Sequence, residues 1–129
     1  MRIERQLSVF LENRPGALAK MCDALAGKDV NILALSVSDT ADYAVVRMIV
    51  NDPDAALEVI EDTGALVVDN DVLLIEMENR VGALGDIARK LSKAGMNIDY
   101  AYCAATSDQP KGILVLRTQD AKKTMKVLA

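Results

Sequence analysis

The residues best suited to chemistry are the asparagines and glycines of a short loop that occurs twice in the chain. The first copy, Glu12–Leu18, reads ENRPGAL, and the second copy, Glu78–Leu84, reads ENRVGAL. A glycine has no Cβ, so a ligand or another backbone segment can approach it closely. An asparagine side chain is both a donor and an acceptor, and it therefore matches the ammonium and the carboxylate of one small molecule. These residue types predict non-covalent binding of a small polar ligand.

The similarity between the two copies extends beyond the loop. Comparison of Val9–Leu33 with Ile75–Asp99 gives 9 identities in 25 positions without a gap. The dipeptide Asn31-Ile32 of the first copy recurs as Asn97-Ile98 in the second. Such internal similarity indicates that one structural unit is encoded twice.

Each loop is expected to join a strand to a helix. Apolar residues alternate before the first loop, which is typical of a strand with one buried face. Pro15 fits the first turn of a helix, where its missing N–H has no intrahelical partner to lose. The N–H groups of a first turn are unpaired and carry a partial positive charge, which favours a small carboxylate there. The helices that follow carry an apolar stripe at i, i+3, i+4 and i+7, which is made of Leu18, Met21, Cys22 and Leu25 and of Leu84, Ile87, Ala88 and Leu91.

The remaining pattern predicts a βαββαβ order for the first copy. We expect strands at 6–12, 30–38, 43–50 and 65–68, and helices at 17–28 and 55–63, the second of them preceded by Asp52 as its cap and by Pro53 in its first turn. The second copy repeats this order with strands at 72–78, 97–105 and 113–117, and with helices at 83–93 and from residue 120. No fourth strand follows, so its first strand would be an unpaired sheet edge. Either the chain is truncated, or a strand from the other copy or from another subunit fills the place.

The predicted fold class is α+β. It consists of two tandem ferredoxin-like βαββαβ units with antiparallel sheets and helices on one face, and the second unit lacks its last strand. We place the domains at residues 1–69 and 70–129, with Asp69-Asn70-Asp71 as a short linker. Units of about 65 residues bury thin cores alone. We therefore expect a shared sheet or interface, and self-association as a homodimer or a higher homo-oligomer.

Composition argues against several functions. The net charge is −4 and the aromatic content is 3% with no Trp, which disfavours nucleic-acid binding. The absence of histidine excludes His-dependent triads and His-ligated metal sites. Cys22 and Cys103 form no CxxC pair and are interpreted as reduced, buried thiols. No signal peptide or membrane-spanning stretch is recognised, so we expect a cytoplasmic protein without a membrane partner, a metal or a cofactor.

The strand, the loop, the helix and Val30-Asn31-Ile32 at the second strand resemble the ACT domain, over essentially the whole chain and in two copies. That family is a βαββαβ module that typically binds free amino acids and regulates metabolic enzymes. The resemblance implies a ligand site between paired units, with the first Asn of serine-sensing members falling on Asn13 and Asn79 and the second on Asn31 and Asn97. The ligand-binding residues expected on this basis are Asn13, Arg14, Pro15, Gly16, Ala17, Leu18, Asn31, Ile32, Asn79, Arg80, Val81, Gly82, Ala83, Leu84, Asn97 and Ile98.

The sequence departs from the serine-sensing pattern in two ways. Those members often carry a His two residues before the loop Asn, where this chain has Leu11 or Met77. The second copy also has Val81 in place of Pro15. The ligand therefore need not be serine, and the two sites need not be equivalent. The second copy also carries two tyrosines, Tyr100 and Tyr102, which have no aromatic counterparts in the first copy. They either line one pocket or are half-buried strand residues.

Structural explanations compete with ligand binding at each of these positions. Asn13 and Asn79 fit a turn or a helix cap for backbone reasons alone. Glycine at the loop serves tight helix–sheet packing as well as a ligand. Arg14 and Arg80 are expected to be solvated, with carboxylate pairing as the alternative.

Three functions are compatible with this pattern. The first is a regulatory module that binds an amino acid at paired ACT units and signals to a separate metabolic enzyme or regulator, without catalysis of its own. The second is an enzyme of the same shape that uses Asp or Glu, although no carboxylate pair repeats in an expected loop. The third is an assembly module without a ligand, which oligomerises through its sheet edges. The duplicated loop and the lack of a nucleophile–base pair favour the first.

Overall fold

The computed structural model describes residues 1–129 as two compact units. We call Arg5–Asn70 the N-terminal unit, and Asp71–Ala129 together with Met1–Glu4 the C-terminal unit. The predicted fold class is confirmed, with antiparallel strands and helices in each unit. The elements are β1 (Arg2–Glu12), α1 (Ala17–Ala26), β2 (Ile32–Asp39), β3 (Tyr43–Val50), α2 (Pro53–Asp62), β4 (Leu66–Glu78), α3 (Ala83–Lys93), β5 (Tyr100–Ala104), β6 (Lys111–Arg117) and α4 (Ala121–Leu128).

The N-terminal unit has the strand order β2-β3-β1-β4. Central strand β3 pairs antiparallel with β1, from Leu7 opposite Met48 to Glu12 opposite Tyr43, and its other edge pairs with β2. Both helices cover one face of this sheet. The buried core beneath them comprises Leu7, Val9, Met21, Leu25, Val30, Val46, Met48, Val50, Ala56 and Ile60.

Local sequence signals explain where the second helix of this unit begins. The Asp52 carboxylate accepts a hydrogen bond from the Ala55 N–H at 3.2 Å and so caps α2. Pro53 occupies the first turn, where no N–H is required. Helix α2 therefore starts at Pro53, and the roles expected for Asp52 and Pro53 are confirmed.

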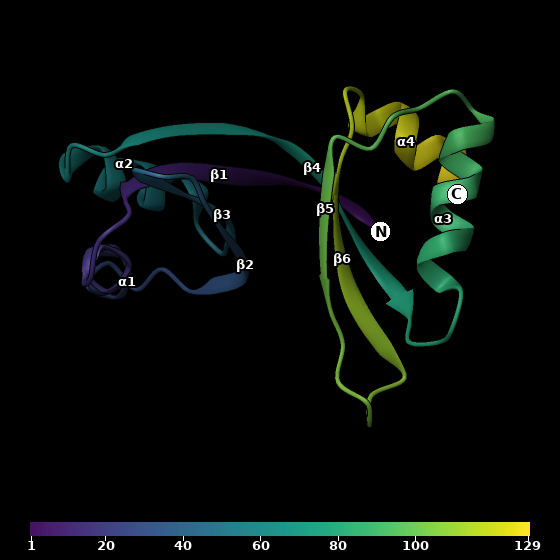
Figure 1. The fold of residues 1–129 in the computed structure, drawn as a ribbon, viewed down its shortest axis with the longest axis horizontal. Coiled ribbons are helices and arrows are strands. Elements are labelled where there is room, and N and C mark those ends of the chain that lie inside the picture. The colour runs from purple at the N-terminus through teal and green to yellow at the C-terminus, as the bar shows by residue number, and fades with distance from the viewer. The chain divides into compact units, whose positions relative to one another are not determined.

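The C-terminal unit has the strand order β1-β4-β6-β5. Strand β6 lies between β4 and β5, with Leu114 opposite Ile75 on one side and Cys103 on the other. Figure 1 shows α3 and α4 on the same side of these strands. The core beneath the helices comprises Leu73, Ile75, Leu91, Leu114 and Leu116, with Ile3, Ile87, Ile98 and Met125 packed against it.

The place of the missing fourth strand is taken by the start of the chain. Met1–Glu4 groups with the C-terminal unit, β1 lies next to β4, and Ile3 packs against that unit's core. The structure thus places a strand from the other copy at this position, which is one of the possibilities left open by the sequence. Two expectations were wrong. Strand β1 begins at Arg2 rather than at residue 6, and the expected linker, Asp69-Asn70-Asp71, lies inside β4.

The physical reason for both errors is the same. Polar and charged residues at 2–5 and 69–71 hide the strand signal in the sequence, while hydrogen bonding along a sheet does not require apolar side chains. The compact units therefore differ from the expected domain limits of 1–69 and 70–129, because Met1–Glu4 lies with the second copy.

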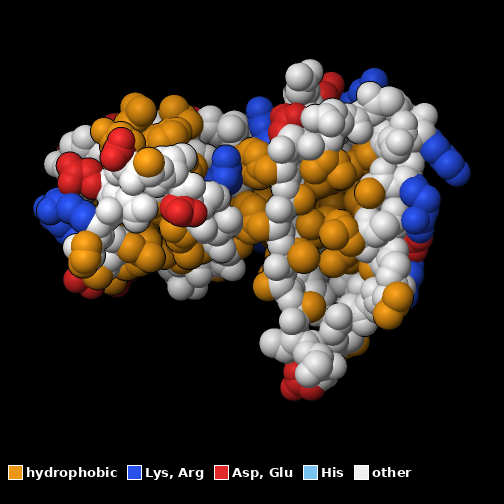
Figure 2. Space-filling model, viewed as in Figure 1, with side chains coloured by type: hydrophobic (Ala, Val, Ile, Leu, Met, Phe, Trp, Pro, Cys, Tyr) orange, Lys and Arg blue, Asp and Glu red, His pale blue; other side chains and the backbone are white.

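Each unit leaves one edge strand with apolar side chains at its surface. Leu35 and Val37 on β2 share the helix-covered face with Met48 and Val46, yet they remain 40% and 48% exposed. In the C-terminal unit, Figure 2 shows hydrophobic side chains gathered at the surface beside β5. Exposed apolar strand edges of this kind are sites where another chain can pair.

The role of the N-terminal residues can be tested at Ile3. We expect Ile3→Ala to lower the free energy of unfolding by about 1–2 kcal/mol, because a half-buried side chain is lost from the C-terminal core. Amide exchange should accelerate at residues 71–78 more than at Tyr43–Val50. Arg2→Ala is the control, because Arg2 is exposed on the same strand. Equal effects of the two substitutions would contradict the role of Ile3 in that core.

Candidate functional site

The two loops adopt the same backbone conformation at their glycines. Gly16 and Gly82 precede α1 and α3 with φ angles of 86° and 87°, in the left-handed region. Residues other than glycine reach this region at a steric cost of about 1–2 kcal/mol. Neither helix has a side chain that caps its N-terminus. The glycine in each loop is therefore required by the turn itself.

This turn leaves backbone donors unused at the start of α1. The Ala17 N–H donates to Arg14 O at 3.3 Å, and the Lys20 N–H donates to Gly16 O at 3.0 Å. The N–H groups of Leu18 and Ala19 have no acceptor within the chain. The second loop repeats the pattern, with Ala83 bonded to Arg80 O at 3.3 Å and Asp86 to Gly82 O at 3.0 Å. Unpaired N–H groups at a helix start attract anions.

The loop asparagines hold the neighbouring hairpin. Asn79 Nδ2 donates to Thr106 O and to Gln109 O, both at 2.8 Å, which uses both amide hydrogens. Asn13 Nδ2 makes one longer bond, 3.4 Å to Thr40 O, while its backbone N–H donates to Asp42 O at 3.0 Å. A structural role for both asparagines therefore has direct support, although it is a bond to the neighbouring hairpin and not a helix cap. What remains for a ligand at Asn79 is the side-chain oxygen.

Asn31 lies at the opposite end of its sheet from Asn13. Ile32 pairs with Val50, whereas Asn13 bonds the residues that follow Asp39, so roughly seven strand residues, about 23 Å, separate the two asparagines. The Asn31 backbone also bonds Asn51, through N–H to Oδ1 at 2.9 Å and through its carbonyl to the Asn51 N–H at 3.1 Å. Asn97 Nδ2 donates to Asp99 Oδ1 at 3.2 Å. One unit alone therefore does not bring its two asparagines together.

The other expected residues divide into exposed loop positions and core neighbours. Arg14 pairs with Glu12 at 2.7 Å, and Arg80 pairs with Glu78 and Asp86, each at 2.7 Å. Both arginines are thus ion-paired at the surface. The exposed positions are Pro15, Leu18, Val81 and Leu84, and the partly or fully buried ones are Ala17, Ile32, Ala83 and Ile98.

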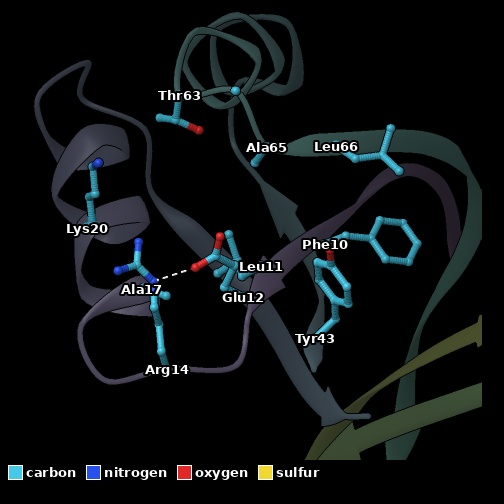
Figure 3. A pocket seen from close by; sticks show the side chains of 11 residues that line it. Phe10, Leu11, Glu12, Arg14, Ala17, Lys20, Tyr43, Thr63, Ala65 and Leu66 are labelled. Carbon is cyan, nitrogen blue, oxygen red and sulfur yellow. Dashed lines mark ion pairs between the residues drawn. The ribbon is translucent and has the colours of Figure 1, made fainter. Parts of the chain in front are cut away.

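A hollow of about 540 Å³ adjoins the first loop, within the N-terminal unit. Figure 3 shows Arg14, Ala17 and Lys20 on one side and Thr63, Ala65 and Leu66 on the other. The residues of the far side, together with Tyr43 and Lys20, were not predicted. Thr63–Leu66 lies far from the loop in sequence and carries no motif. A signal for Lys20 is present in the sequence, because the repeat comparison aligns this lysine with an acid, Asp86, and so marks a charge difference between the two copies.

The corresponding hollow in the C-terminal unit, of about 440 Å³, is lined by β4, its loop and α3. There Arg80 binds Asp86, and Arg89 binds the same carboxylate. The hydrogen bond from Arg80, followed by that from Arg89, lowers the pKa of Asp86 below its ordinary value. The same contacts to Asp86 and then to Glu78 raise the pKa of Arg80. The acid–base network at this loop is therefore satisfied internally.

The cysteines, the tyrosines of β5 and the acidic residues form no further candidate site. Cys22 is half-buried and Cys103 is exposed, and both are free thiols, so the expectation of burial was wrong for Cys103 on its edge strand. Tyr100 and Tyr102 are half-buried on β5. No cluster of three or more His, Cys, Asp or Glu side chains is arranged to hold a metal ion. None of the helices is long and apolar enough to span a membrane.

Comparison with protein families identifies the architecture. The model of the ACT domain pair matches residues 1–129. The chain belongs to the ACT domain pair family. The resemblance of the duplicated loop to this family is thereby confirmed, and the pair accounts for all 129 residues.

Solved structures share this ACT pair fold. Protein BT0572 from Bacteroides thetaiotaomicron is 35% identical, with a TM-score of 0.90 over 98% of this chain and 86% of that one. The ligand-free regulatory subunit of aspartate kinase from Thermus thermophilus is 15% identical, with a TM-score of 0.72 and coverage of 98% and 93%. Aspartokinase III from E. coli, in complex with lysine and aspartate, is 14% identical, with a TM-score of 0.60 over 98% of this chain and 31% of that one. No curated protein sequence matches this chain significantly.

The loop asparagines should differ in their effect on stability. We expect Asn79→Ala to cost about 1 kcal/mol or more, because two hydrogen bonds to the β5–β6 loop are lost. Asn13→Ala should cost less, since its single side-chain bond is 3.4 Å long. Urea unfolding of both variants measures the difference. An equal or reversed order would show that these bonds do not anchor the hairpins.

Asp86 should make stability depend on pH on the acid side. The folded-state pKa is lowered, so the unfolded chain binds the proton more tightly. The stabilisation is present above the ordinary Asp value of about 3.9 and is lost as the pH falls through the folded value. Asp86→Asn should therefore flatten the stability curve below about pH 4. Asp62→Asn serves as control, because Asp62 is exposed on α2 and forms no ion pair; a similar change in both variants would contradict this role.

Proposed function

We propose that this chain is a non-catalytic regulatory module that binds a free amino acid where two ACT units pair. Ligand binding would be passed on to a separate metabolic enzyme or regulator. The observation that carries the proposal is the pair of glycine turns, each of which leaves first-turn N–H groups without an acceptor. Such groups suit the carboxylate that every free amino acid carries.

The distribution of asparagines supports a site built from two units. Asn13 and Asn31 are held at opposite ends of one sheet, so a ligand that contacts both kinds of Asn needs one from each of two units. The Asn79 amide hydrogens are already used, which leaves its oxygen to accept a hydrogen bond from the ligand ammonium. We expect the contacts at Asn13, Arg14, Gly16 and their counterparts to be made through the backbone more than through side chains.

The related structures add general support for regulation. The regulatory subunits of aspartate kinase from Thermus thermophilus and Thermus flavus share this fold, at 15% and 17% identity. Aspartokinase III from E. coli was solved with lysine and aspartate bound. A role in sensing amino acids follows for this chain as part of the proposal, without a choice of ligand or of target enzyme.

A thermal-shift screen against the twenty amino acids tests the proposal. A ligand present at about 100 times its dissociation constant stabilises the folded state by roughly 2.7 kcal/mol. For a chain of this length, the melting temperature should rise by several degrees, at roughly 2–8 °C per kcal/mol. We expect one amino acid, or a few of related chemistry, to produce this shift.

Variants at glycines with positive φ provide matched controls. Gly16→Asn and Gly82→Asn place a side chain in each loop, and Asn tolerates the left-handed conformation better than most residues. Both should reduce the ligand-induced shift. Gly95→Asn is the control, because Gly95 also has a positive φ and open space but lies at the end of α3. A shift that survives both loop substitutions, or the absence of any shift, would refute binding at the loops.

The exposed edges of β2 and β5 favour a second candidate function, an assembly module without a ligand. Leu35 and Val37 would be covered if β2 paired with a strand of another chain, and a homodimer is the commonest outcome of such pairing. Sedimentation of Val37→Lys separates the two functions. If Val37→Lys loses assembly and the parent chain shows no thermal shift with any amino acid, the scaffold function is supported. If the parent chain does show a shift, and Val37→Lys loses both the shift and assembly, a binding site at the paired units is supported.

A further inference from the structure

We propose that the hollow in the N-terminal unit is a second binding site, for a small organic carboxylate with an apolar body. The hollow adjoins the first loop and shares Arg14 and Ala17 with it, but all of its lining lies within one unit, so it needs no second unit to bind a ligand. In Figure 3, helix α1 forms one wall, the Thr63–Leu66 segment forms the other, and β1 lies between them. Its volume of about 540 Å³ falls in the usual range for small-molecule sites.

The polar side of the hollow offers charge that the chain does not use. Lys20 lines the hollow and forms no ion pair or hydrogen bond through its ammonium group. Arg14 binds Glu12 through Nε, so its two terminal nitrogens remain available. The three charged side chains that line the hollow, Glu12, Arg14 and Lys20, together carry one net positive charge. One carboxylate on the ligand would balance this charge, with donors from Lys20 and Arg14.

The other side of the hollow is apolar. Its lining includes Phe10, Leu11, Ala65 and Leu66, along with the ring of Tyr43. Leu66 is 65% exposed and Tyr43 is 52% exposed, which is high for large apolar or aromatic side chains on strands. A ligand with a hydrocarbon or aromatic body would remove this surface from water. An anion without such a body would use only half of the site.

The hollow also lies at the end of a strand. Side chains on a strand point alternately to opposite faces, yet the last three residues of β1 line the hollow, namely Phe10, Leu11 and Glu12. The hollow therefore extends around the end of β1 and touches both faces of the strand. The ligand would lie against this end of β1, beside the start of α1.

The C-terminal unit differs at the decisive positions. Lys20 corresponds to Asp86, which binds Arg80 and so fills the counterpart of the cationic corner with its own carboxylate. Lys90 and Lys93 line that hollow further along α3, and no residue of another helix forms a facing wall. The second hollow thus lacks both the free cation beside the loop and the apolar far side. We expect the ligand to bind the N-terminal unit alone.

Titration of the full chain with phenylacetate, followed by amide NMR shifts, tests this inference. Phenylacetate carries one carboxylate and an apolar ring but no amino group. Saturable shifts are expected at Phe10–Glu12, Lys20, Tyr43 and Thr63–Leu66, without matching shifts at Ile75–Glu78. Acetate, inorganic phosphate and the neutral phenylacetamide should each bind at least about tenfold more weakly, given the size of a charged hydrogen bond or of a buried ring.

Charge substitutions copied from the repeat sharpen the test. Lys20→Asp gives the first unit the acid of the second and should weaken phenylacetate about tenfold or more. Lys28→Asp makes the same charge change on an exposed residue beyond α1 that does not line the hollow, and it should change affinity less than about twofold. Leu66→Ala should also weaken phenylacetate, and it tests the apolar side without altering charge.

Three results would overturn the inference. One is equal phenylacetate affinity in the parent chain and in Lys20→Asp. Another is phosphate binding as tight as phenylacetate, which would make the hollow a general anion site. The third is equal shifts in both units. Because the probe is not an amino acid and Gly16 is untouched, failure here leaves the loop site standing, and failure of the amino-acid screen leaves this hollow standing.

Discussion

The rest of the structure depends on the need of β4 for a hydrogen-bonded neighbour along its length. Backbone N–H and C=O groups that leave water without partners are costly, so a long strand requires a long neighbour. Strand β4 has 13 residues and β1 has 11, and each contributes residues to both compact units. Leu66–Asn70 completes the first βαββαβ unit. Met1–Glu4 then lies with the second unit, where β1 is the neighbour of β4.

The two loops are also held by backbone and amide hydrogen bonds. In each loop a glycine with a left-handed backbone allows the turn from strand to helix, and an asparagine side-chain amide donates to the nearby hairpin. These contacts hold the loop in place without using the first-turn N–H groups. The first-turn N–H groups are thereby left without an acceptor, which favours anion binding at the helix start.

Duplication preserved the backbone of the loop and allowed its charges to diverge. Lys20 in the first unit is free, whereas Asp86 in the second closes a network with Arg80 and Arg89. A surface network of this kind adds little stability, because solvent screens exposed pairs. On the proposal made above, its main effect would be to change which ligands the neighbouring hollow attracts. Two units with one fold would then differ in the ligand that they bind through a single position.

The sequence by itself determined the repeated unit and the identity of the loop. The positions of Gly16 and Gly82, the apolar helix stripes and the capping residue Asp52 act locally, so their structural roles follow from spacing and backbone preference. The family resemblance came from the same residues, since the loop and Asn31-Ile32 recur in register.

Only the tertiary structure decided which partner completed the second sheet and which residues faced the loops. The strand segment at Arg2–Glu4 is short and the β4 segment at Asp69–Asp71 is polar, so neither is recognised locally, and they become strands because neighbouring backbone groups need hydrogen-bond partners. Thr63–Leu66 reaches Lys20 only because α1 and α2 cover the same face of one sheet. Long-range pairing and packing bring such residues together, and neither leaves a periodic signal in the sequence.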